Sequence, residues 1–368
     1  MSAEAPVEGR PADGAYALVA PQAREIAAPE LDYRPPMPNE RGVPIGLIGA
    51  GGISFAHLDA YRRYGLNVVA IADRHLDRAA LRRDQHFPAA LATDRVDDLI
   101  GNPAIKVLDI TLHPDGRAPL IRRALEAGQH VLSQKPFVRD LALGAELVAL
   151  AEARGLQLAV NQNGRFAPHL AWMRAAVAAG LVGSVTGVHV SIQWDHGWVA
   201  GTSFDAMEHL ILEDFAIHWF DFLVSIIGDT AHGITARTAR ATGQTARTSL
   251  LAQAMVGFNG GQASLVFDGN TAFGAMDTTV ITGTRGTLRS SGPDLGRQQV
   301  SLFTAEGVAR PVLEGQWFND GFAGTMGALL VAIETGRAPI HAARGNLAAL
   351  RLGHAAMESA ASGLPVAI

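Results

Sequence analysis

The chain has 368 residues, of which 48% are hydrophobic, 18% charged and 6% aromatic, and its formal net charge is -5 at pH 7. At roughly 100–200 residues per domain, this length and apolar content predict two domains and exclude an intrinsically disordered chain. The acidic balance excludes the basic surface that nucleic acid requires, and the absence of cysteine excludes disulfides, thiolate metal sites and a cysteine nucleophile.

Residues 1–40 are rich in Ala, Pro and Glu, and prolines at the end of this segment oppose both helix and sheet. We expect an extended arm that wraps over its own domain or a neighbouring subunit, with disorder as the alternative. The segment lacks the apolar core of a secretory signal, and the chain has no apolar run of about 18 residues to span a membrane. We therefore expect a cytoplasmic protein with no membrane partner.

Between residues 41 and 163, short aliphatic runs alternate with amphipathic stretches of helix length. This alternation predicts right-handed βαβ crossovers and a doubly wound parallel sheet with helices on both faces, which is a Rossmann domain. The predicted strands are 45–49, 67–73, 107–112, 130–133 and 157–160, and the predicted helices include 53–64, 117–127 and 141–153.

Residues 164–368 have longer alternating segments separated by Gly-rich turns, which are typical of antiparallel sheet. We expect a second, α+β domain with a large, mostly antiparallel open sheet and helices on one face. Its predicted strands include 185–192, 250–258, 262–267 and 278–282, and its predicted helices are 168–179, 213–227, 321–335 and 343–362.

A glycine-rich turn lies between the first predicted strand and the following helix. The run Gly49-Ala50-Gly51-Gly52-Ile53-Ser54 fits the G-x-G-x-x-G/A pattern of dinucleotide-binding turns. Gly49 permits the tight turn, and Gly51 lets the backbone approach a pyrophosphate. The phosphates are expected at the helix N-terminus beside Gly52 and Ile53, although such turns also occur without a ligand.

Asp73 ends the next predicted strand, where a carboxylate accepts hydrogen bonds from the adenosine ribose of a dinucleotide. It therefore favours NAD over NADP, whose 2′-phosphate it would repel. Arg74 follows directly, and because a guanidinium there can bind that phosphate, the sequence leaves NADP open.

Lys135 follows a predicted strand and precedes a proline, at the strand edge where open α/β sheets hold ligands. This position favours proton transfer to or from a hydroxyl over the role of a solvated lysine. Asp214 and His218 are four residues apart and share one face of a predicted helix. They form either an ordinary pair within that helix or, with Lys135, a site for a substrate hydroxyl. No cluster has the spacing of metal ligands, so we expect no metal.

The glycine turn, Gln134-Lys135-Pro136 and Asp214-x-x-x-His218-x-x-Asp221, in this order, resemble the Gfo/Idh/MocA oxidoreductases, which include glucose–fructose oxidoreductase and inositol dehydrogenases. The resemblance covers nearly all of residues 43–368. It implies a Rossmann domain that binds NAD or NADP, and a C-terminal domain that supplies substrate contacts and oligomer interfaces. It also implies hydride transfer between nicotinamide C4 and a ring carbon of a sugar or cyclitol, and a homodimer or homotetramer.

By position, the resemblance makes Lys135 the lysine of the family's Glu-Lys-Pro motif, Asp214 its substrate-binding aspartate and His218 its catalytic histidine. The resemblance also makes Gln134 and Lys135 candidates for binding the cofactor. Gln134 replaces the usual glutamate, which removes one negative charge beside Lys135. The segment 111–117 also departs from the usual Thr-Pro-x-x-x-His stretch, which leaves contacts near the nicotinamide ribose open.

Four further residues are weaker candidates. We expect Thr111 and His113 near the cofactor, as the resemblance places them. Arg165 follows the last Rossmann strand and is a candidate for binding cofactor or substrate. The indole of Trp198 suits a pyranose ring, although core or interface packing explains it equally well.

The sequence thus predicts an NAD(P)-dependent dehydrogenase that acts on a secondary hydroxyl of a sugar, glycoside or cyclitol, with Lys135 and His218 as an acid/base relay. One alternative is a redox-neutral enzyme that retains NAD and cleaves glycosides by oxidation, elimination and reduction. Another is a dinucleotide-binding regulator that has lost the reaction.

Overall fold

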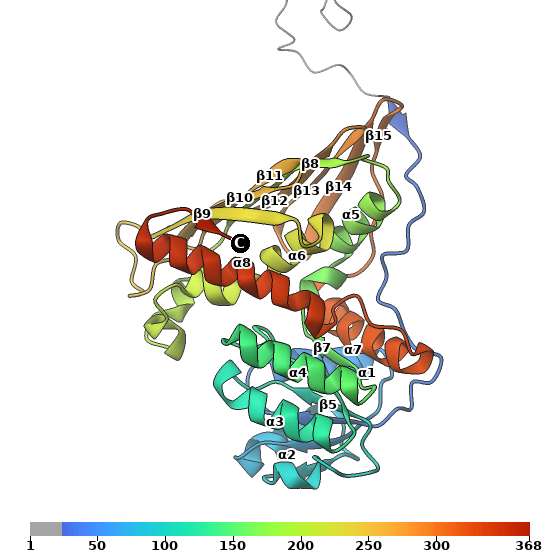
Figure 1. Ribbon diagram of the computed structural model, residues 1–368. Helices are drawn as coiled ribbons and strands as arrows, with labels where there is room; N and C mark the ends of the chain where they lie inside the picture. The colour runs from blue at the N-terminus through green and yellow to red at the C-terminus, as the bar shows by residue number, and fades with distance from the viewer. Residues whose placement is uncertain (1–23) are drawn as a thin grey trace, which may run out of the picture.

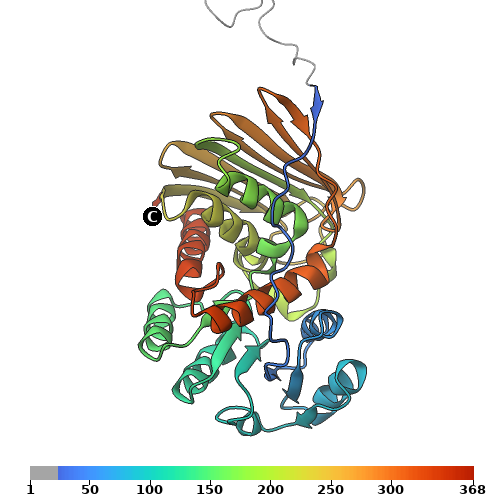
Figure 2. The same ribbon diagram turned by 90° about the vertical axis from the view of Figure 1, so that its right-hand side faces the viewer.

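The computed structural model describes residues 24–368, which form two sheets with helices packed between and around them (Figure 1). The smaller sheet has the strand order β4-β3-β2-β5-β6-β7, and the larger has the order β1-β15-β14-β13-β12-β8-β11-β10-β9-β16. Figure 2 shows the large sheet as a broad open layer above the small one. The predicted fold class is confirmed.

All five strand pairs of the small sheet are parallel, as expected for βαβ units. Helix α3 begins at Pro114, earlier than predicted, because proline is tolerated in the first helical turn. The strands are β2 (Ile45–Ile48), β3 (Val68–Ala72), β4 (Leu91–Thr93), β5 (Val107–Ile110), β6 (His130–Ser133) and β7 (Leu158–Val160), and the helices are α1 (Ser54–Arg63), α2 (Leu76–His86), α3 (Pro114–Glu126) and α4 (Leu141–Ala153).

The large sheet is antiparallel except where β8 pairs with β11 and β1 with β15. Its buried face packs against α5 (Pro168–Ala178), α6 (Ile217–Ile227) and α8 (Ala343–Ser362). Its strands are β1 (Glu25–Ile26), β8 (Val185–Gln193), β9 (Ala231–Ala239), β10 (Leu251–Phe258), β11 (Gly261–Asp268), β12 (Met276–Gly283), β13 (Gly286–Asp294), β14 (Arg297–Thr304), β15 (Gly307–Ala309) and β16 (Val366–Ala367).

Helix α7 (Trp317–Thr335) joins the two layers. It lies in the C-terminal half of the sequence, yet Phe322 and Met326 pack in one hydrophobic cluster with Ile45 and Leu47 of the small sheet. The buried residues of the nucleotide-binding layer therefore come from both halves of the chain. The domain boundary at residue 163 stays a prediction.

The described part of the N-terminal arm, residues 24–40, runs along the outside of its own chain (Figure 2). It pairs with β15 through β1, and the Tyr33 hydroxyl accepts a hydrogen bond from the Glu314 N–H at 3.0 Å. Lower down, Met37 packs against the cluster of the small sheet. The arm therefore spans both layers, and residues 1–23 lie outside the described part.

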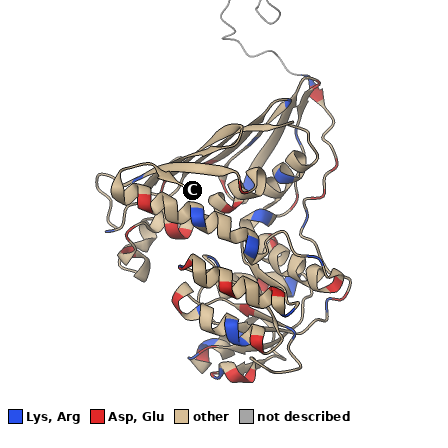
Figure 3. Ribbon diagram, in the orientation of Figure 1, with Lys and Arg blue, Asp and Glu red and all other residues tan. Residues whose placement is uncertain are grey.

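Charged residues of both signs are interspersed along the helices, while the strands of the large sheet carry few of them in the view of Figure 3. No helix among residues 24–368 is long and apolar enough to cross a membrane.

Three buried histidines lead us to expect a loss of stability in acid. Burial lowers the pKa of His169, His218 and His341 to about 3 in the folded protein, whereas an unfolded histidine titrates near pH ~6.5. Unfolding below pH ~6 therefore takes up a proton at each of these sites. Asp277 has the opposite effect. Burial raises its pKa to about 7 in the folded protein, so unfolding releases one proton from this carboxyl group.

Because unfolding takes up about two protons in total, the free energy of unfolding falls by about 3 kcal/mol for each unit by which the pH is lowered between roughly pH 6 and pH 4. Urea unfolding followed by tryptophan fluorescence at several pH values measures this slope. An unfolding free energy that stays constant from pH 7 to pH 5 would contradict the expected burial of the three imidazoles.

Candidate active site

The glycine turn forms an open cradle at the carboxyl end of β2. Gly49 has φ 105°, and a Cβ atom there would lie 2.9 Å from the Leu112 side chain. Gly51 and Gly52 instead face open space, where a Cβ atom would meet nothing within 4 Å. Helix α1 has no side-chain N-cap, and among residues 24–368 the N–H groups of Gly51, Gly52 and Ile53 before it have no backbone partner, so they are available to an anion. The turn therefore fits the pyrophosphate of a dinucleotide.

Asp73 follows β3 beside this turn. Its carboxylate accepts hydrogen bonds from the Ala50 N–H at 2.8 Å and the His75 N–H at 2.9 Å. These contacts fix the carboxylate next to the glycine turn, at the position expected for the adenosine ribose. Arg74 beside it is exposed.

Arg82 on α2 is a site residue that sequence reasoning missed. Its guanidinium donates to the Gly51 carbonyl oxygen at 3.1 Å and to Ser54 Oγ at 3.2 Å, and it lies over the Phe55 ring. It thus places a positive charge directly over the turn. No sequence pattern connects an arginine in the next helix with the glycine turn, because the fold alone brings them together.

We expect Arg82→Ala to raise the Kd for NAD about tenfold, since a charge-assisted hydrogen bond to phosphate is lost. Isothermal titration calorimetry measures this change. Arg78→Ala, which removes an exposed arginine one turn earlier on α2, is the matched control and should leave the Kd unchanged. Equal Kd values for both variants would contradict a role of Arg82 at the turn.

The segment after β5 contacts both the glycine turn and the loop that carries Lys135. The Thr111 hydroxyl donates to the Gly49 carbonyl oxygen at 2.5 Å, which ties β5 to the glycine turn. His113 occupies the N-cap position of α3 without a capping hydrogen bond from its side chain, and its ring lies 6.2 Å from that of Phe204. Arg117 is fully buried and donates to the Pro136 carbonyl oxygen at 2.7 Å. Burial lowers the pKa of Arg117 to about 9, and its contact holds the loop that carries Lys135.

Lys135 and Asp214 form an ion pair across the two layers. Lys135 Nζ donates to Asp214 Oδ1 at 3.0 Å and to the Asp214 carbonyl oxygen at 2.8 Å. The two side chains keep 14% and 30% of their surface exposed, so the pair is accessible to a ligand. Burial alone would raise the pKa of Asp214, but the charge and hydrogen bond of Lys135, together with smaller contributions from His218 and His113, hold that pKa below its usual value.

Asp214 and His218 lie at a junction of two helix types. The predicted helix 213–227 is a π-helical turn, Ile211–Phe215, followed by α6 from Ile217. Such turns occur frequently at functional sites. Burial and the ammonium of Lys135 lower the pKa of His218 to about 3, so its imidazole is neutral near pH 7. Its Nδ1 is buried and has no hydrogen-bond partner among residues 24–368.

The geometry does not support the predicted ligand contact of Arg165. Its Nε and Nη2 donate to the two Asp221 carboxylate oxygens at 2.6 and 2.9 Å, and its Nη1 donates to the Ile340 carbonyl oxygen. All three guanidinium nitrogens are therefore engaged within the protein. Sequence reasoning missed this pair because its partners are 56 residues apart.

Aromatic side chains after β8 reach the segment that follows β5, where the Phe204 ring lies 6.2 Å from that of His113. Trp198 is 61% exposed, and its ring lies 5.7 Å from Phe204 and 6.1 Å from His196. His196 Nδ1 is buried without a partner among the described residues. These rings come from the loop after β8, so the large sheet places them over the strand edge of the small one.

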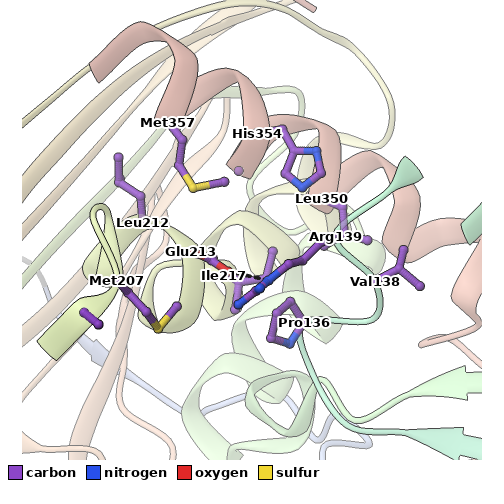
Figure 4. Close-up of a pocket in the computed structure, with 12 residues that line it drawn as sticks. Pro136, Val138, Arg139, Met207, Leu212, Glu213, Ile217, Leu350, His354 and Met357 are labelled. Atoms are coloured by element: carbon purple, nitrogen blue, oxygen red, sulfur yellow. Dashed lines mark hydrogen bonds and ion pairs between the residues drawn. The ribbon is translucent and has the colours of Figure 1, made fainter. Parts of the chain in front are cut away.

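A cavity of about 420 Å³ adjoins the ion pair on the side of α8. Figure 4 shows Arg139 extending toward Glu213, with His354 contributed by α8. Pro136 and Glu213, the neighbours of the paired residues, line this cavity, but Lys135, Asp214 and His218 do not. Among residues 24–368, no group of three or more metal-binding side chains is brought together.

Comparison with known proteins decides the family. Residues 43–162 match a family described as an oxidoreductase family with an NAD-binding Rossmann fold, and residues 170–289 match the GFO/IDH/MocA C-terminal domain. The chain belongs to the Gfo/Idh/MocA oxidoreductase family. The predicted family is thereby confirmed.

Several proteins are similar to this Gfo/Idh/MocA chain. D-apiose dehydrogenase of Paraburkholderia graminis is 29% identical over 196 residues, which span 53% of the chain and 52% of that protein, about half of each. Inositol 2-dehydrogenase of Rhizobium meliloti is 23% identical, covering 89% of the chain and 99% of that protein. The structure of an oxidoreductase from Agrobacterium radiobacter in complex with NAD+, L-tartaric acid and magnesium has a TM-score of 0.79 at 24% identity, covering 88% and 98%.

The family that matches residues 43–162 is described as having an NAD-binding Rossmann fold, which confirms the predicted cofactor, NAD. The residues present fit NAD: the open glycine turn faces the N-terminus of α1, and Asp73 lies beside it. The individual site residues are assigned in the proposal that follows.

Proposed function

We propose that this protein is an NAD-dependent dehydrogenase that oxidises a secondary hydroxyl of a sugar, glycoside or cyclitol. The observation that carries the proposal is the Lys135–Asp214 pair beside a neutral His218, at the sheet edge where the glycine turn opens. The names of D-apiose dehydrogenase and inositol 2-dehydrogenase support a substrate of this class.

Lys135 and His218 handle the proton of the substrate hydroxyl in this proposal. Lys135 releases a proton to the neutral imidazole of His218 as it takes up the proton of the hydroxyl, and its ammonium stabilises the negative charge that develops on the oxygen. Asp214 holds Lys135 in place at 3.0 Å and accepts a hydrogen bond from a neighbouring hydroxyl. When bound, NAD supplies the hydride acceptor.

The aromatic residues at the approach orient the ring. The exposed indole of Trp198 offers an apolar face to the C–H groups of a pyranose or cyclitol. The imidazole of His196, whose ring lies 6.1 Å from that of Trp198, adds a polar group beside this face. This combination of flat faces and single polar atoms suits a ligand with many hydroxyls and few charges.

We further propose a homodimer or homotetramer that uses the outer face of the large sheet. Met255 and Val266, 64% and 40% exposed, lie on the neighbouring strands β10 and β11. Apolar side chains on a sheet with few charges suit a surface that a second copy covers. A cytoplasmic location remains a prediction.

The proposal is tested by following absorbance at the NADH band while the protein, with NAD and separately with NADP, is offered inositols, free sugars and alkyl or aryl glycosides. Reduction with one class of substrate is the expected result. Release of an aglycone without net NADH would replace the proposal with the redox-neutral glycoside-cleaving reaction. No reaction with any substrate despite NAD binding would favour a regulator.

A further inference from the structure

A second ion pair joins the same two segments as the Lys135–Asp214 pair. Arg139 Nε donates to Glu213 Oε1 at 3.1 Å, and Figure 4 shows the arginine reaching toward Glu213 at the edge of the cavity. Lys135 and Arg139 both belong to the loop between β6 and α4. Glu213 and Asp214 are consecutive residues of the π-helical turn. Two cations of one loop are thus matched by two carboxylates of one turn.

Arg139 also ties this loop to the start of α3. Its Nη1 donates to both oxygens of the Asp115 carboxylate, at 2.9 and 3.2 Å. Asp115 lies in the first turn of α3. The guanidinium therefore bridges a carboxylate of the small-sheet layer and one of the large-sheet layer. A lysine could not do the same, because its ammonium is a single point charge without the fork of a guanidinium.

The backbone on both sides of Arg139 is anchored. Phe137 and Val138 before it are buried in the core of the small-sheet layer, and Asp140 after it caps α4. On the facing π-helical turn, Leu212 is buried in the core of the large-sheet layer. Because each segment is fixed within its own layer, the register between them is set where their charged side chains meet.

In the proposed reaction, a substrate hydroxyl competes for Lys135 and Asp214. Their hydrogen bonds of 2.8 and 3.0 Å also join the two layers, so a ligand that takes over part of them weakens this joint. The Arg139–Glu213 pair lies on the cavity side of the turn and binds no substrate in the proposal. It therefore keeps the loop and the turn in register while Lys135 and Asp214 contact the ligand.

We propose that Arg139 is a positioning residue, which holds Lys135 against Asp214 in the catalytic arrangement. It acts through its bonds to Glu213 and Asp115. Its effect on turnover rests on the proposed function, whereas its hold on the Lys135 amine does not. Two measurements on the full-length protein therefore test it, one without a substrate and one with.

Amine labelling tests the position of Lys135 without any substrate. Lys106 and Lys135 are the only lysines of the chain, so limited acetylation with acetic anhydride, followed by mass spectrometry of the peptides, compares Lys135 with an internal reference. Arg139→Met should raise the labelling rate at Lys135 by about threefold or more, because a loosened pair exposes the amine. The rate at Lys106 should not change. Arg344→Met is the matched control, since it removes another exposed arginine that joins α8 to α4 through Glu152.

Turnover of the substrate that the panel identifies is the second measurement. Arg139→Met should lower kcat about tenfold and leave the Kd for NAD unchanged. Arg139→Lys should recover part of this loss, because its ammonium reaches one carboxylate but not two. Glu213→Gln should lower kcat less than Arg139→Met does. The double variant should be no slower than Arg139→Met alone, since both changes break the same bond.

An unchanged labelling rate at Lys135 in Arg139→Met would overturn the proposal, as would a kcat within about twofold of the native value. Faster labelling of both lysines, or weaker binding of NAD, would indicate general damage and would also overturn it. Faster labelling of Lys135 alone, in a protein that turns over none of the substrates, would support the positioning role and overturn the proposed function instead.

Discussion

Lys135→Met is expected to lower kcat at least a thousandfold toward whichever substrate the panel identifies. The ammonium lies 3.0 Å from Asp214 and beside His218, where charge develops on the substrate oxygen. Removing a group that stabilises such charge costs about a hundred- to a thousandfold, and the loss of its role in proton transfer adds to this. The Kd for NAD should change little, since the glycine turn and Asp73 are untouched.

Lys135→Arg separates charge from proton transfer. An arginine keeps the positive charge and can pair with Asp214, but its pKa is too high for it to release a proton near pH 7. We therefore expect this variant to fold, to bind NAD and to remain at least a hundredfold slower than the native protein. Activity close to native in Lys135→Arg would show that charge alone suffices.

The composition supplies a matched control. Lys106 and Lys135 are the only lysines among the 368 residues, so arginine provides nearly all other positive charge. Lys106 is exposed on the segment before β5. Lys106→Met should leave kcat and the Kd for NAD unchanged, and a comparable loss of activity in both lysine variants would point to general damage.

Much of the fold follows from local patterns. Helix α4 begins at Leu141, as predicted, because Asp140 caps its start by accepting from the Ala142 and Leu143 N–H groups. Strand β13 was missed because its sequence is rich in Gly, Ser, Pro and Asp, which are poor strand formers. Pairing with β12 and β14 on either side overrides that preference.

The residues of the candidate site were likewise predicted only in part. Motifs with local spacing, such as the glycine turn and the Asp214–His218 pair, are readable in the sequence because neighbours in the chain form them. Arg82 and the partner of Arg165 are not readable, since each contact depends on elements far apart in the chain. Side chains that satisfy each other across layers therefore have to come from the structure.

His218→Asn is expected to lower kcat about a hundredfold or more, because an amide cannot accept the hydroxyl proton. In the native protein the pKa of His218 is about 3, so its imidazole stays neutral well below pH 6. Titration of His218 should therefore leave kcat flat between about pH 6 and 8. An acid limb near pH ~6.5 in the native enzyme that disappears in His218→Asn would contradict the burial of this side chain.

His354→Asn is the control for this experiment, since His354 lines the neighbouring cavity from α8 and not the ion pair. We expect it to keep kcat near the native value. If His354→Asn were slow and His218→Asn active, the chemistry would lie on the cavity side of the π-helical turn. The pair of histidine variants thus decides on which face of that turn the substrate hydroxyl is bound.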